Sequence, residues 1–337
     1  MTHRVGISGY GLAGRYFHAP LLKAAGFEVV GVVTKNSERR AQASADFPAT
    51  SVVGSVSELL DLGLDLLVVA SANSAHASDA IAGLRRKVPV VIDKPMGRDA
   101  SETREIIAVS EEMGTVVSTY FNRLFDSDAL TVKKALDEGV LGQVFRLDSR
   151  FERFRPESNP QSWRETNSAA DGGGNLLDLG PHLVSLALNW FGPAQVTYAS
   201  VRSIRGLSDD DIVINLKHES GVDSYLSASA IIGSDGPRIR LSGTNGSLVI
   251  KDLDSQESRL RAGEYPKGGV WIPPAITPAF IHRGDEVIPY SGEAGNYSLF
   301  YLKVAEAING QGPWPVTPDD ALAVAKILDD ARALSIR

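Results

Sequence analysis

The feature that most constrains this fold is a glycine-rich turn near the start of the chain. Residues 9–14 read Gly-Tyr-Gly-Leu-Ala-Gly and directly follow the apolar run 4–8. In such a turn Gly9 permits a tight bend, Gly11 lets a phosphate approach the backbone, and Gly14 lets the next helix pack close to the strand. The start of that helix presents N–H groups and the positive end of its dipole to phosphates. The turn therefore predicts a dinucleotide site; the alternative is a structural glycine turn in an α/β domain with another ligand.

Short apolar runs alternate with helical patterns from the start of the chain to about residue 120. The runs suit strands that are buried on both faces of a parallel sheet; they span residues 4–8, 28–33, 65–70, 88–92 and 115–119. Between them, apolar spacing predicts helices over 75–87 and 99–112, and capping boxes at 55–58 and 99–102 mark helix starts. The alternation predicts a doubly wound α/β domain.

The rest of the chain predicts a different architecture. A helix is expected over 126–138, ended by Gly139, and a strand over 144–151. Four more strand patterns follow with few helices between them, at 195–203, 212–218, 222–231 and 238–250, the last bending at Asn245-Gly246. Such a succession predicts a mainly antiparallel sheet. The segment 252–290 has no clear pattern and receives no assignment.

These patterns predict two domains. Residues 1–121 form the expected dinucleotide-binding domain, and residues 122–337 the expected substrate and oligomerisation domain. A helix predicted over 317–334 is a candidate for packing back on the first domain.

Composition excludes several functional classes. The 337 residues carry a net charge of −7 and no run of Lys or Arg, so neither nucleic acid nor an anionic membrane surface is expected as a partner. The absence of cysteine excludes disulfide scaffolds, cysteine-ligated metal sites and a cysteine nucleophile. No apolar stretch reaches the ~20 residues that span a bilayer, and the N-terminus lacks the layout of a signal peptide. A cytoplasmic location is the resulting expectation.

The end of the second predicted strand bears on the choice of dinucleotide. An NAD site usually has an acidic residue there, whereas this chain has Thr34, followed by Lys35, Arg39 and Arg40, with Glu38 the one acid among them. A hydroxyl and cations attract a 2′-phosphate that a carboxylate would repel. The segment predicts NADP(H) in preference to NAD. The alternative places the arginines on a solvated helix face, and this is expected for at least one of them.

Two short segments contain candidate catalytic groups. Lys94, in Asp93-Lys94-Pro95, follows the fifth predicted strand, at the edge of an α/β sheet where ligands bind; the alternative is a solvated loop lysine. Asp178 and His182 are four positions apart and would share one face of a helix, kinked at the Gly-Pro between them. There His182 can act as a general base, with Asp178 holding its tautomer. The alternative is a buried structural histidine.

In their order along the chain, these motifs resemble those of the Gfo/Idh/MocA family of oxidoreductases, and the resemblance covers essentially the whole length. The glycine turn, the segment 93–95 and the Asp-Leu-Gly-Pro-His segment 178–182 carry it, although the family usually has Glu where 93–95 begins with Asp. The segment 71–76 resembles a family loop without its proline, and Asn122-Arg123 matches a common family segment.

A branch of that family is also similar in three further segments. Residues 14–20, 163–165 and 172–183 resemble the NADP-dependent scyllo-inositol dehydrogenases, and Thr34 in place of an acid agrees with that branch.

The resemblance implies a fold and an activity. The expected fold is an N-terminal Rossmann domain with a doubly wound parallel sheet, followed by an α+β domain on an open, mainly antiparallel sheet. The expected activity is reversible oxidation of a secondary alcohol of a cyclic polyol or sugar to a ketone. His182 is then the general base, Lys94 hydrogen-bonds the reacting oxygen, and Asp178 orients His182 or binds a substrate hydroxyl.

The resemblance also implies the binding residues. Those expected at NADP or NAD lie in the glycine turn, after the second strand and in the loops after the fourth and fifth strands: Gly9, Tyr10, Gly11, Leu12, Ala13, Gly14, Thr34, Lys35, Arg39, Ser71, Asn73, His76 and Lys94. Those expected at the substrate are Arg123, Arg153, Arg155 and Trp163. Arg153 and Arg155 are alternatively ordinary surface charges, and no metal is expected.

Other functions stay open on this resemblance, because a fold does not fix a function. They are a redox-neutral NAD-dependent enzyme that cleaves glycosides, a non-catalytic NADP(H)-sensing protein, and a reductase of sugar nucleotides or amino sugars. The expected partners are a small-molecule polyol or sugar and further copies of the chain. A dimer or tetramer is expected, because family members commonly bury the exposed face of the second sheet against another subunit.

Overall fold

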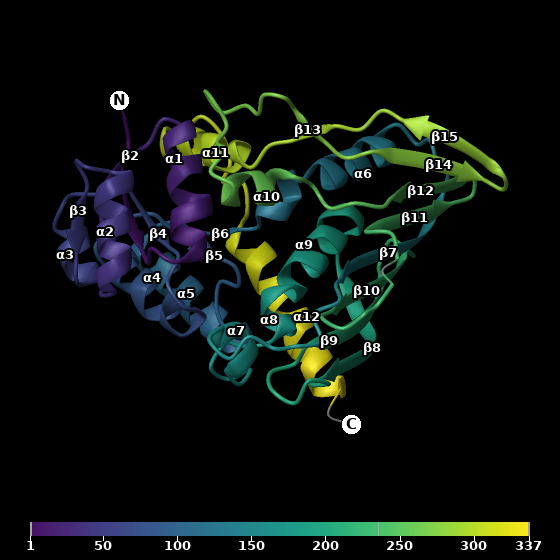
Figure 1. Cartoon of the computed structure of the whole chain (residues 1–337), viewed down its shortest axis with the longest axis horizontal. Helices are drawn as coiled ribbons and strands as arrows, with labels where there is room; N and C mark the ends of the chain where they lie inside the picture. Colours follow the sequence, from purple (N-terminus) through teal and green to yellow (C-terminus); the bar gives the residue numbers. More distant parts are fainter. Residues whose placement is uncertain (1, 235, 336–337) are drawn as a thin grey trace. The chain divides into compact units, whose positions relative to one another are not determined.

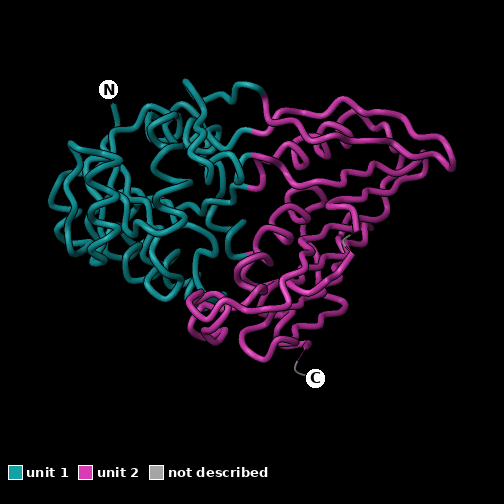
Figure 2. Tube along the Cα trace, in the orientation of Figure 1, with its two compact units in different colours: residues 1–122, 256–273, 296–322 teal, residues 123–255, 274–295, 323–337 magenta. Residues whose placement is uncertain are grey.

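A computed structural model describes residues 2–234 and 236–335 of the chain. Contacts between residues divide the chain into two units, coloured separately in Figure 2. Unit 1 contains Met1–Asn122, Gln256–Pro273 and Asn296–Leu322, and unit 2 contains Arg123–Ser255, Pro274–Gly295 and Ala323–Arg337. The chain thus first passes into unit 2 after Asn122, and two later segments belong to unit 1. The boundary between the predicted dinucleotide-binding domain, 1–121, and the predicted substrate and oligomerisation domain, 122–337, separates two functions and stays a prediction.

Unit 1 is built on a parallel sheet of six strands in the order β3-β2-β1-β4-β5-β6; all of these strands except β1 are labelled in Figure 1. This confirms the predicted doubly wound sheet, and the strand order reverses beside β1, where such sheets bind ligands. The short edge strand β3 was not predicted, since three residues make too brief a pattern to recognise. The strands are β1 Arg4–Ser8, β2 Glu28–Val33, β3 Ser51–Val53, β4 Leu66–Val69, β5 Val90–Asp93 and β6 Val117–Tyr120.

The helices of unit 1 begin where the sequence places caps. The Ser55 hydroxyl accepts the Glu58 N–H at 3.3 Å, and the Asp99 carboxylate accepts the Glu102 N–H at 2.8 Å. These contacts confirm both capping boxes. The helices are η1 Ala13–His18, α1 Ala19–Ala24, α2 Ser37–Asp46, α3 Val56–Leu60, η2 Asn73–Ala75, α4 His76–Arg85, α5 Ala100–Met113, α10 Gln256–Arg261 and α11 Ser298–Ile308.

Unit 2 is built on an eight-stranded sheet in the order β15-β14-β12-β11-β7-β10-β9-β8. Only the β7–β10 pair is parallel among its described strands, which confirms a mainly antiparallel sheet. The predicted bend at Asn245-Gly246 is the hairpin between β11 and β12. The strands are β7 Val144–Glu152, β8 Ala194–Arg202, β9 Asp211–His218, β10 Asp223–Ser229, β11 Ile239–Gly243, β12 Gly246–Ile250, β14 Ala279–Arg283 and β15 Glu286–Tyr290; β13 Ala275–Ile276 pairs separately with β16 Ala294–Gly295.

Helices cover one face of this second sheet. α9 contacts β7 and β10, and α8 contacts β9 and β10. The strand residues that meet them are buried and apolar, such as Leu147, Ile214 and Leu226. The remaining helices are η3 Asn122–Phe125, α6 Ser127–Asp137, α7 Trp163–Thr166, α8 Asn175–Asp178, α9 Gly180–Phe191 and α12 Pro318–Ser335. Within the described ranges, no helix has both the length and the apolar character needed to cross a membrane.

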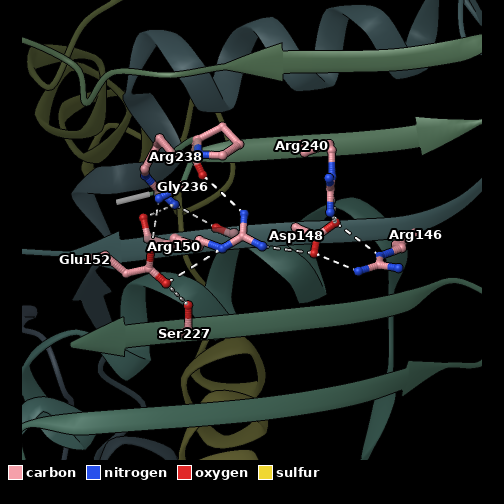
Figure 3. Close-up of polar contacts among 10 residues, drawn as sticks. Arg146, Asp148, Arg150, Glu152, Ser227, Gly236, Arg238 and Arg240 are labelled. Carbon is pink, nitrogen blue, oxygen red and sulfur yellow. Dashed lines mark hydrogen bonds and ion pairs between the residues drawn. The ribbon is translucent and has the colours of Figure 1, made fainter. Parts of the chain in front are cut away.

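The other face of the sheet carries a polar network (Figure 3). Along β7, Arg146, Asp148 and Arg150 alternate with the buried apolar residues, so they lie on the opposite face. Asp148 accepts hydrogen bonds from both of these arginines at 3.0 and 3.2 Å, and from Arg240 of β11 at 2.9 Å. Burial by itself would raise the pKa of Asp148, but the guanidinium groups outweigh it, and its pKa is lowered.

Candidate active site

The glycine turn of unit 1 has the geometry that its sequence predicts. Gly9 has φ of +96°, and a methyl group there would lie 2.5 Å from the Ala70 carbonyl oxygen. A methyl group at Gly14 would lie 2.1 Å from the Gly9 oxygen. At Gly11, by contrast, the nearest atom that a methyl group would meet is Nη1 of Arg39, at 3.7 Å. Gly9 and Gly14 are therefore required by packing, whereas the space beside Gly11 can admit a phosphate group.

The side chain of Tyr10 hydrogen-bonds the glycine turn to the end of α2. It is 1% exposed, and its hydroxyl donates to Asp46 at 2.9 Å. Asp46, at the end of α2, also accepts from Arg15 at 2.7 Å. Burial and the carboxylate raise the pKa of Tyr10, so its hydroxyl keeps its proton. Any contact of Tyr10 with a dinucleotide would have to use the backbone.

The residues after β2 divide into two kinds. The Asn36 side chain accepts the Arg39 N–H at 3.0 Å and caps α2, so Arg39 lies in the first turn beside Gly11. Arg40 instead donates to the carbonyls of Thr34 and Val52, at 3.2 and 3.0 Å. Arg40 thus has a structural role, whereas Arg39 is the cation beside Gly11, and its contact with a phosphate stays a prediction.

The remaining residues predicted here differ in exposure. Lys35 is exposed, Thr34 is 7% exposed, and Leu12, in the glycine turn, is 40% exposed. Their roles at a dinucleotide stay predictions, as does that of Ala13.

The loop after β4 is held to β1 by an aspartate. Asp79 of α4 accepts hydrogen bonds from Ser8 at 2.7 Å and Ser71 at 2.9 Å. Asn73 is 8% exposed within the same loop. Ser8 ends the strand that leads into the glycine turn, so Asp79 connects the two loops that border the predicted site.

His76 connects this loop to the next one. It is 1% exposed; its Nδ1 lies 2.9 Å from the carbonyl oxygen of Pro95, and its Nε2 lies 3.2 Å from that of Ser71. Burial lowers the pKa of His76 despite the opposite effect of Asp93. The imidazole is therefore neutral at pH 7 and carries a single N–H for these two acceptors. This places His76 between the loops as a spacer, while its direct contact with a dinucleotide stays a prediction.

Lys94 follows β5 directly, at the carboxyl edge of the sheet. Its backbone N–H donates to the Asp93 carboxylate at 2.9 Å, and its peptide bond to Pro95 is cis. The Asp93 side chain is 15% exposed and lies 3.8 Å from Nε2 of the buried His18. Burial raises the pKa of Asp93, but the surrounding cationic and hydrogen-bonding groups outweigh this effect and lower it. Asp93 is thus an ionised carboxylate beside Lys94.

In unit 2, the segment that carries Asp178 starts from a capped helix. Gly174 has φ of +94°, and the Asp209 carboxylate accepts the Leu176 N–H at 2.7 Å. α8 ends at Asp178, and α9 begins at Gly180, so the predicted kink separates two helices. His182 lies in the first turn of α9.

Asp178 forms an ion pair with Arg164 that the sequence analysis does not predict. Arg164 of α7 donates to Asp178 at 3.3 Å, and its guanidinium carbon lies 4.4 Å from the ring centre of Trp163. Trp163 and Asp178, both predicted from the sequence, thus both contact Arg164. The position of Arg164 next to Trp163 in one motif was the signal that could have identified it. That Asp178 orients His182 stays a prediction.

His182 is 6% exposed and lies beside an aromatic ring that also went unpredicted. The rings of His182 and Phe151 are 6.1 Å apart. Two guanidinium groups face Phe151, that of Arg238 at 3.9 Å and that of Arg123 at 5.6 Å. Arg123 also donates to Asp126 at 3.2 Å. The predicted residues Arg123 and His182 therefore share Phe151 as a neighbour.

Arg153 and Arg155 follow the end of β7. Arg153 is partly buried, whereas Arg155 is exposed. Their backbone N–H groups donate to the carbonyls of Ser229 and Ala230, which extends the pairing of the strands. Their substrate contacts stay predictions.

Each unit thus brings together part of the predicted set. Unit 1 combines a turn that can admit a phosphate, a cation beside it and a lysine at the sheet edge. Unit 2 combines a buried imidazole with an aspartate–arginine pair. The first set suits a dinucleotide, and the second contains groups able to accept a proton and to bind hydroxyls.

Models of two protein domains match the chain. Residues 3–121 match the domain described as "Oxidoreductase family, NAD-binding Rossmann fold". Residues 129–249 match the "GFO/IDH/MocA C-terminal domain".

Several known proteins are similar over nearly their whole length. The scyllo-inositol 2-dehydrogenase (NADP(+)) IolW of Bacillus subtilis is 31% identical, covering 98% of this chain and 93% of that protein. The 1,5-anhydro-D-fructose reductase of Ensifer adhaerens is 25% identical, covering 99% and 98%. The solved structure of yvaA from Bacillus subtilis has a TM-score of 0.89 at 29% identity, covering 100% of this chain and 96% of that one.

Proposed function

The chain belongs to the GFO/IDH/MocA family of oxidoreductases, whose first domain is an NAD-binding Rossmann fold, and from that membership we propose its reaction. It oxidises a secondary alcohol of a cyclic polyol or sugar to a ketone, reversibly, with NADP(H) preferred to NAD(H). Two similar proteins support the substrate class, because their names concern a cyclic polyol, scyllo-inositol, and an anhydro-sugar.

One observation above all carries the proposal. The space beside Gly11 is bordered by the guanidinium of Arg39, 3.7 Å from where a methyl group would be. A pyrophosphate fits a turn with this opening at the start of a helix. A guanidinium on that side favours the additional 2′-phosphate of NADP, since Arg binds phosphate through a planar fork of donors. Gly9–Gly14, Arg39 and the loop at Ser71 would hold the cofactor.

The cofactor supplies the hydride chemistry when it is bound. An imidazole nitrogen of His182 takes the proton of the substrate hydroxyl during oxidation and returns it in the reverse direction. The Lys94 ammonium donates a hydrogen bond to the same oxygen as negative charge develops on it, which stabilises the transition state. Asp178 accepts a hydrogen bond from a neighbouring substrate hydroxyl, and Arg164 keeps this carboxylate in place.

The proposed assembly is a homo-oligomer, either a dimer or a tetramer. It would cover the polar face of the second sheet, where Arg146 and Arg240 are 42% and 41% exposed (Figure 3). Light scattering coupled to size-exclusion chromatography gives the mass directly. A monomer at micromolar concentration would contradict this part of the proposal alone.

The reaction is tested by initial rates with scyllo-inositol, myo-inositol and glucose, each with NADP+ and NAD+. The expected result is turnover of at least one polyol with NADP+ well above NAD+. His182→Ala should lower kcat by about 100-fold or more, the usual contribution of a general base, while NADPH binding survives. His282→Ala, the same substitution on β14 at a residue with no role in the proposed site, is the matched control.

Other results would point to other functions. Near-normal turnover in the His182 variant would contradict its role. Cofactor that stays bound and never accumulates in reduced form would indicate redox-neutral glycoside cleavage. Cofactor binding without turnover of any polyol or sugar would indicate a sensing protein.

A further inference from the structure

A buried histidine that the proposed reaction does not use lies behind the turn that carries Lys94. His18 is 0% exposed, its Nδ1 lies 2.5 Å from the Tyr301 hydroxyl, and its Nε2 lies 3.8 Å from a carboxylate oxygen of Asp93. We propose that Tyr301 and His18 are positioning residues for Lys94: the Tyr301 hydroxyl fixes the His18 proton on Nε2, and this N–H holds the Asp93 carboxylate to which the Lys94 backbone is bonded. The inference rests on the proposed function of Lys94.

The three elements that meet here are distant in sequence but belong to unit 1. His18 is the last residue of η1, Asp93 is the last residue of β5, and Tyr301 lies in α11. The ring of Tyr120, from β6, lies 4.6 Å from the His18 ring and stacks on Tyr301 at 5.6 Å. Two aromatic rings, those of Tyr120 and Tyr301, therefore lie against the imidazole.

The direction of the hydrogen bond follows from the charges around it. Burial, with Tyr120 and Asp93 adding to it, raises the pKa of Tyr301 well above its usual value, so this phenol keeps its proton. A neutral His18 with its only proton on Nδ1 would turn the lone pair of Nε2 toward an anionic carboxylate. With Tyr301 donating to Nδ1, the proton of His18 lies on Nε2 and faces Asp93 instead. A protonated His18 would also carry a proton on Nε2.

The effect of His18 on Asp93 is electrostatic. A separation of 3.8 Å is longer than a hydrogen bond, so the Nε2–H dipole of His18 acts on the Asp93 carboxylate through space. Of the groups that lower the pKa of Asp93 against the effect of burial, His18 has the largest effect, followed by Lys94 and His76. The carboxylate then accepts the Lys94 N–H at 2.9 Å. The orientation of the turn therefore depends on the tautomer of His18, which is set by the hydroxyl of a tyrosine 283 residues away in sequence.

The tautomer can be measured without any enzyme activity. Long-range proton–nitrogen NMR of the full chain with ¹⁵N-labelled histidine distinguishes protonated from unprotonated ring nitrogens, and the His18→Gln variant assigns the signal among the six histidines. The expected result at pH 7 is a proton on Nε2 of His18. In Tyr301→Phe the proton should redistribute between the two nitrogens. A proton on Nδ1 alone in the wild-type protein would overturn the inference.

Kinetics then test the link to Lys94. Loss of one hydrogen bond of this kind should lower kcat roughly 3- to 10-fold in Tyr301→Phe, with KM for the polyol and Kd for NADPH unchanged. Tyr297→Phe, which removes a second fully buried tyrosine hydroxyl at the start of α11, is the matched control and should keep its kcat. His18→Gln, which keeps a donor for Asp93, should retain more of kcat than His18→Leu.

Failure of the inference differs from failure of the proposed function. An active enzyme whose kcat is unchanged in both Tyr301→Phe and His18→Leu would refute the positioning role. A chain that turns over no polyol would refute the proposed function, and the NMR result would still decide whether His18 holds its proton toward Asp93.

Discussion

The guanidinium of Arg39 lies beside Gly11, 3.7 Å from the position that a methyl group there would occupy. Arg39 is presented by the first turn of α2, which the Asn36 side chain caps at 3.0 Å. The cap of α2 therefore positions the Arg39 guanidinium beside Gly11. This contact is the structural basis of the cofactor preference proposed above.

Replacing Arg39 with alanine should weaken NADPH binding selectively. A hydrogen bond to a charged group contributes about 1.5–3 kcal/mol, so Kd for NADPH should rise roughly 10- to 100-fold, with little change for NADH. Fluorescence titration of both cofactors measures the difference. Arg40→Ala is the control, because Arg40 donates to two backbone carbonyls; it should lower stability without changing the ratio of the two affinities. Equal losses for NADPH and NADH in Arg39→Ala would reject the assignment.

Substitution by alanine should have different effects at two glycines of the same turn: loss of stability at Gly14 and loss of cofactor affinity at Gly11. In Gly14→Ala the new methyl group would lie 2.1 Å from the Gly9 oxygen, so this variant should unfold at a lower temperature or fail to fold. In Gly11→Ala nothing lies closer than 3.7 Å, so the fold should survive while cofactor affinity falls. Thermal unfolding with and without NADPH separates the two effects. A Gly11→Ala protein that NADPH still stabilises like the wild type would place the phosphates elsewhere.

Stability should fall as the pH drops below about 6.5, partly because of His218. This residue is 2% exposed, and burial lowers its pKa from the usual 6.5, although its contact with the Gly192 carbonyl acts in the opposite direction. The unfolded chain therefore binds more protons than the folded one in this range, and the free energy of unfolding declines until the native pKa is reached. His218→Gln should reduce this slope without removing it, because His76 contributes with the same sign.

Urea unfolding at pH 7.5 and pH 5.5 measures that slope. If the free energy of unfolding changes between these two pH values by the same amount in the His218 variant as in the wild type, His218 does not titrate as its burial implies.

The carboxylate of Asp148 should contribute strongly to the stability of the second sheet. Its side chain is 2% exposed and is bonded to three arginines. Asp148→Asn should lower the free energy of unfolding by about 1.5–3 kcal/mol, the scale of a charged hydrogen bond. Asp137→Asn makes the same chemical change in a pair whose side chains are 58% and 63% exposed, and its effect should be far smaller. Equal effects in the two variants would contradict this role of burial.

Local patterns predicted most of the secondary structure because each depends on neighbouring residues. The apolar runs of the parallel sheet, the caps at Ser55 and Asp99, and the hairpin at Asn245-Gly246 are all confirmed. The segment 252–290 had no readable pattern. It contains α10 and the strands β13, β14 and β15, of which β14 pairs with β15 across residues 284–285 and with β12. β13 has only two residues, too few to show an alternation, and pairs with β16 outside the segment.

The same division applies to the candidate site. The sequence by itself determined the family, the two kinds of sheet, the glycine turn and the candidate groups Lys94 and His182, because these depend on residue type and spacing. Only the tertiary structure decided that Arg39 rather than Arg40 borders Gly11, that Asp178 pairs with Arg164, and that His18 meets Tyr301. Those contacts form between side chains of separate elements, and a local sequence pattern does not show which distant residues meet.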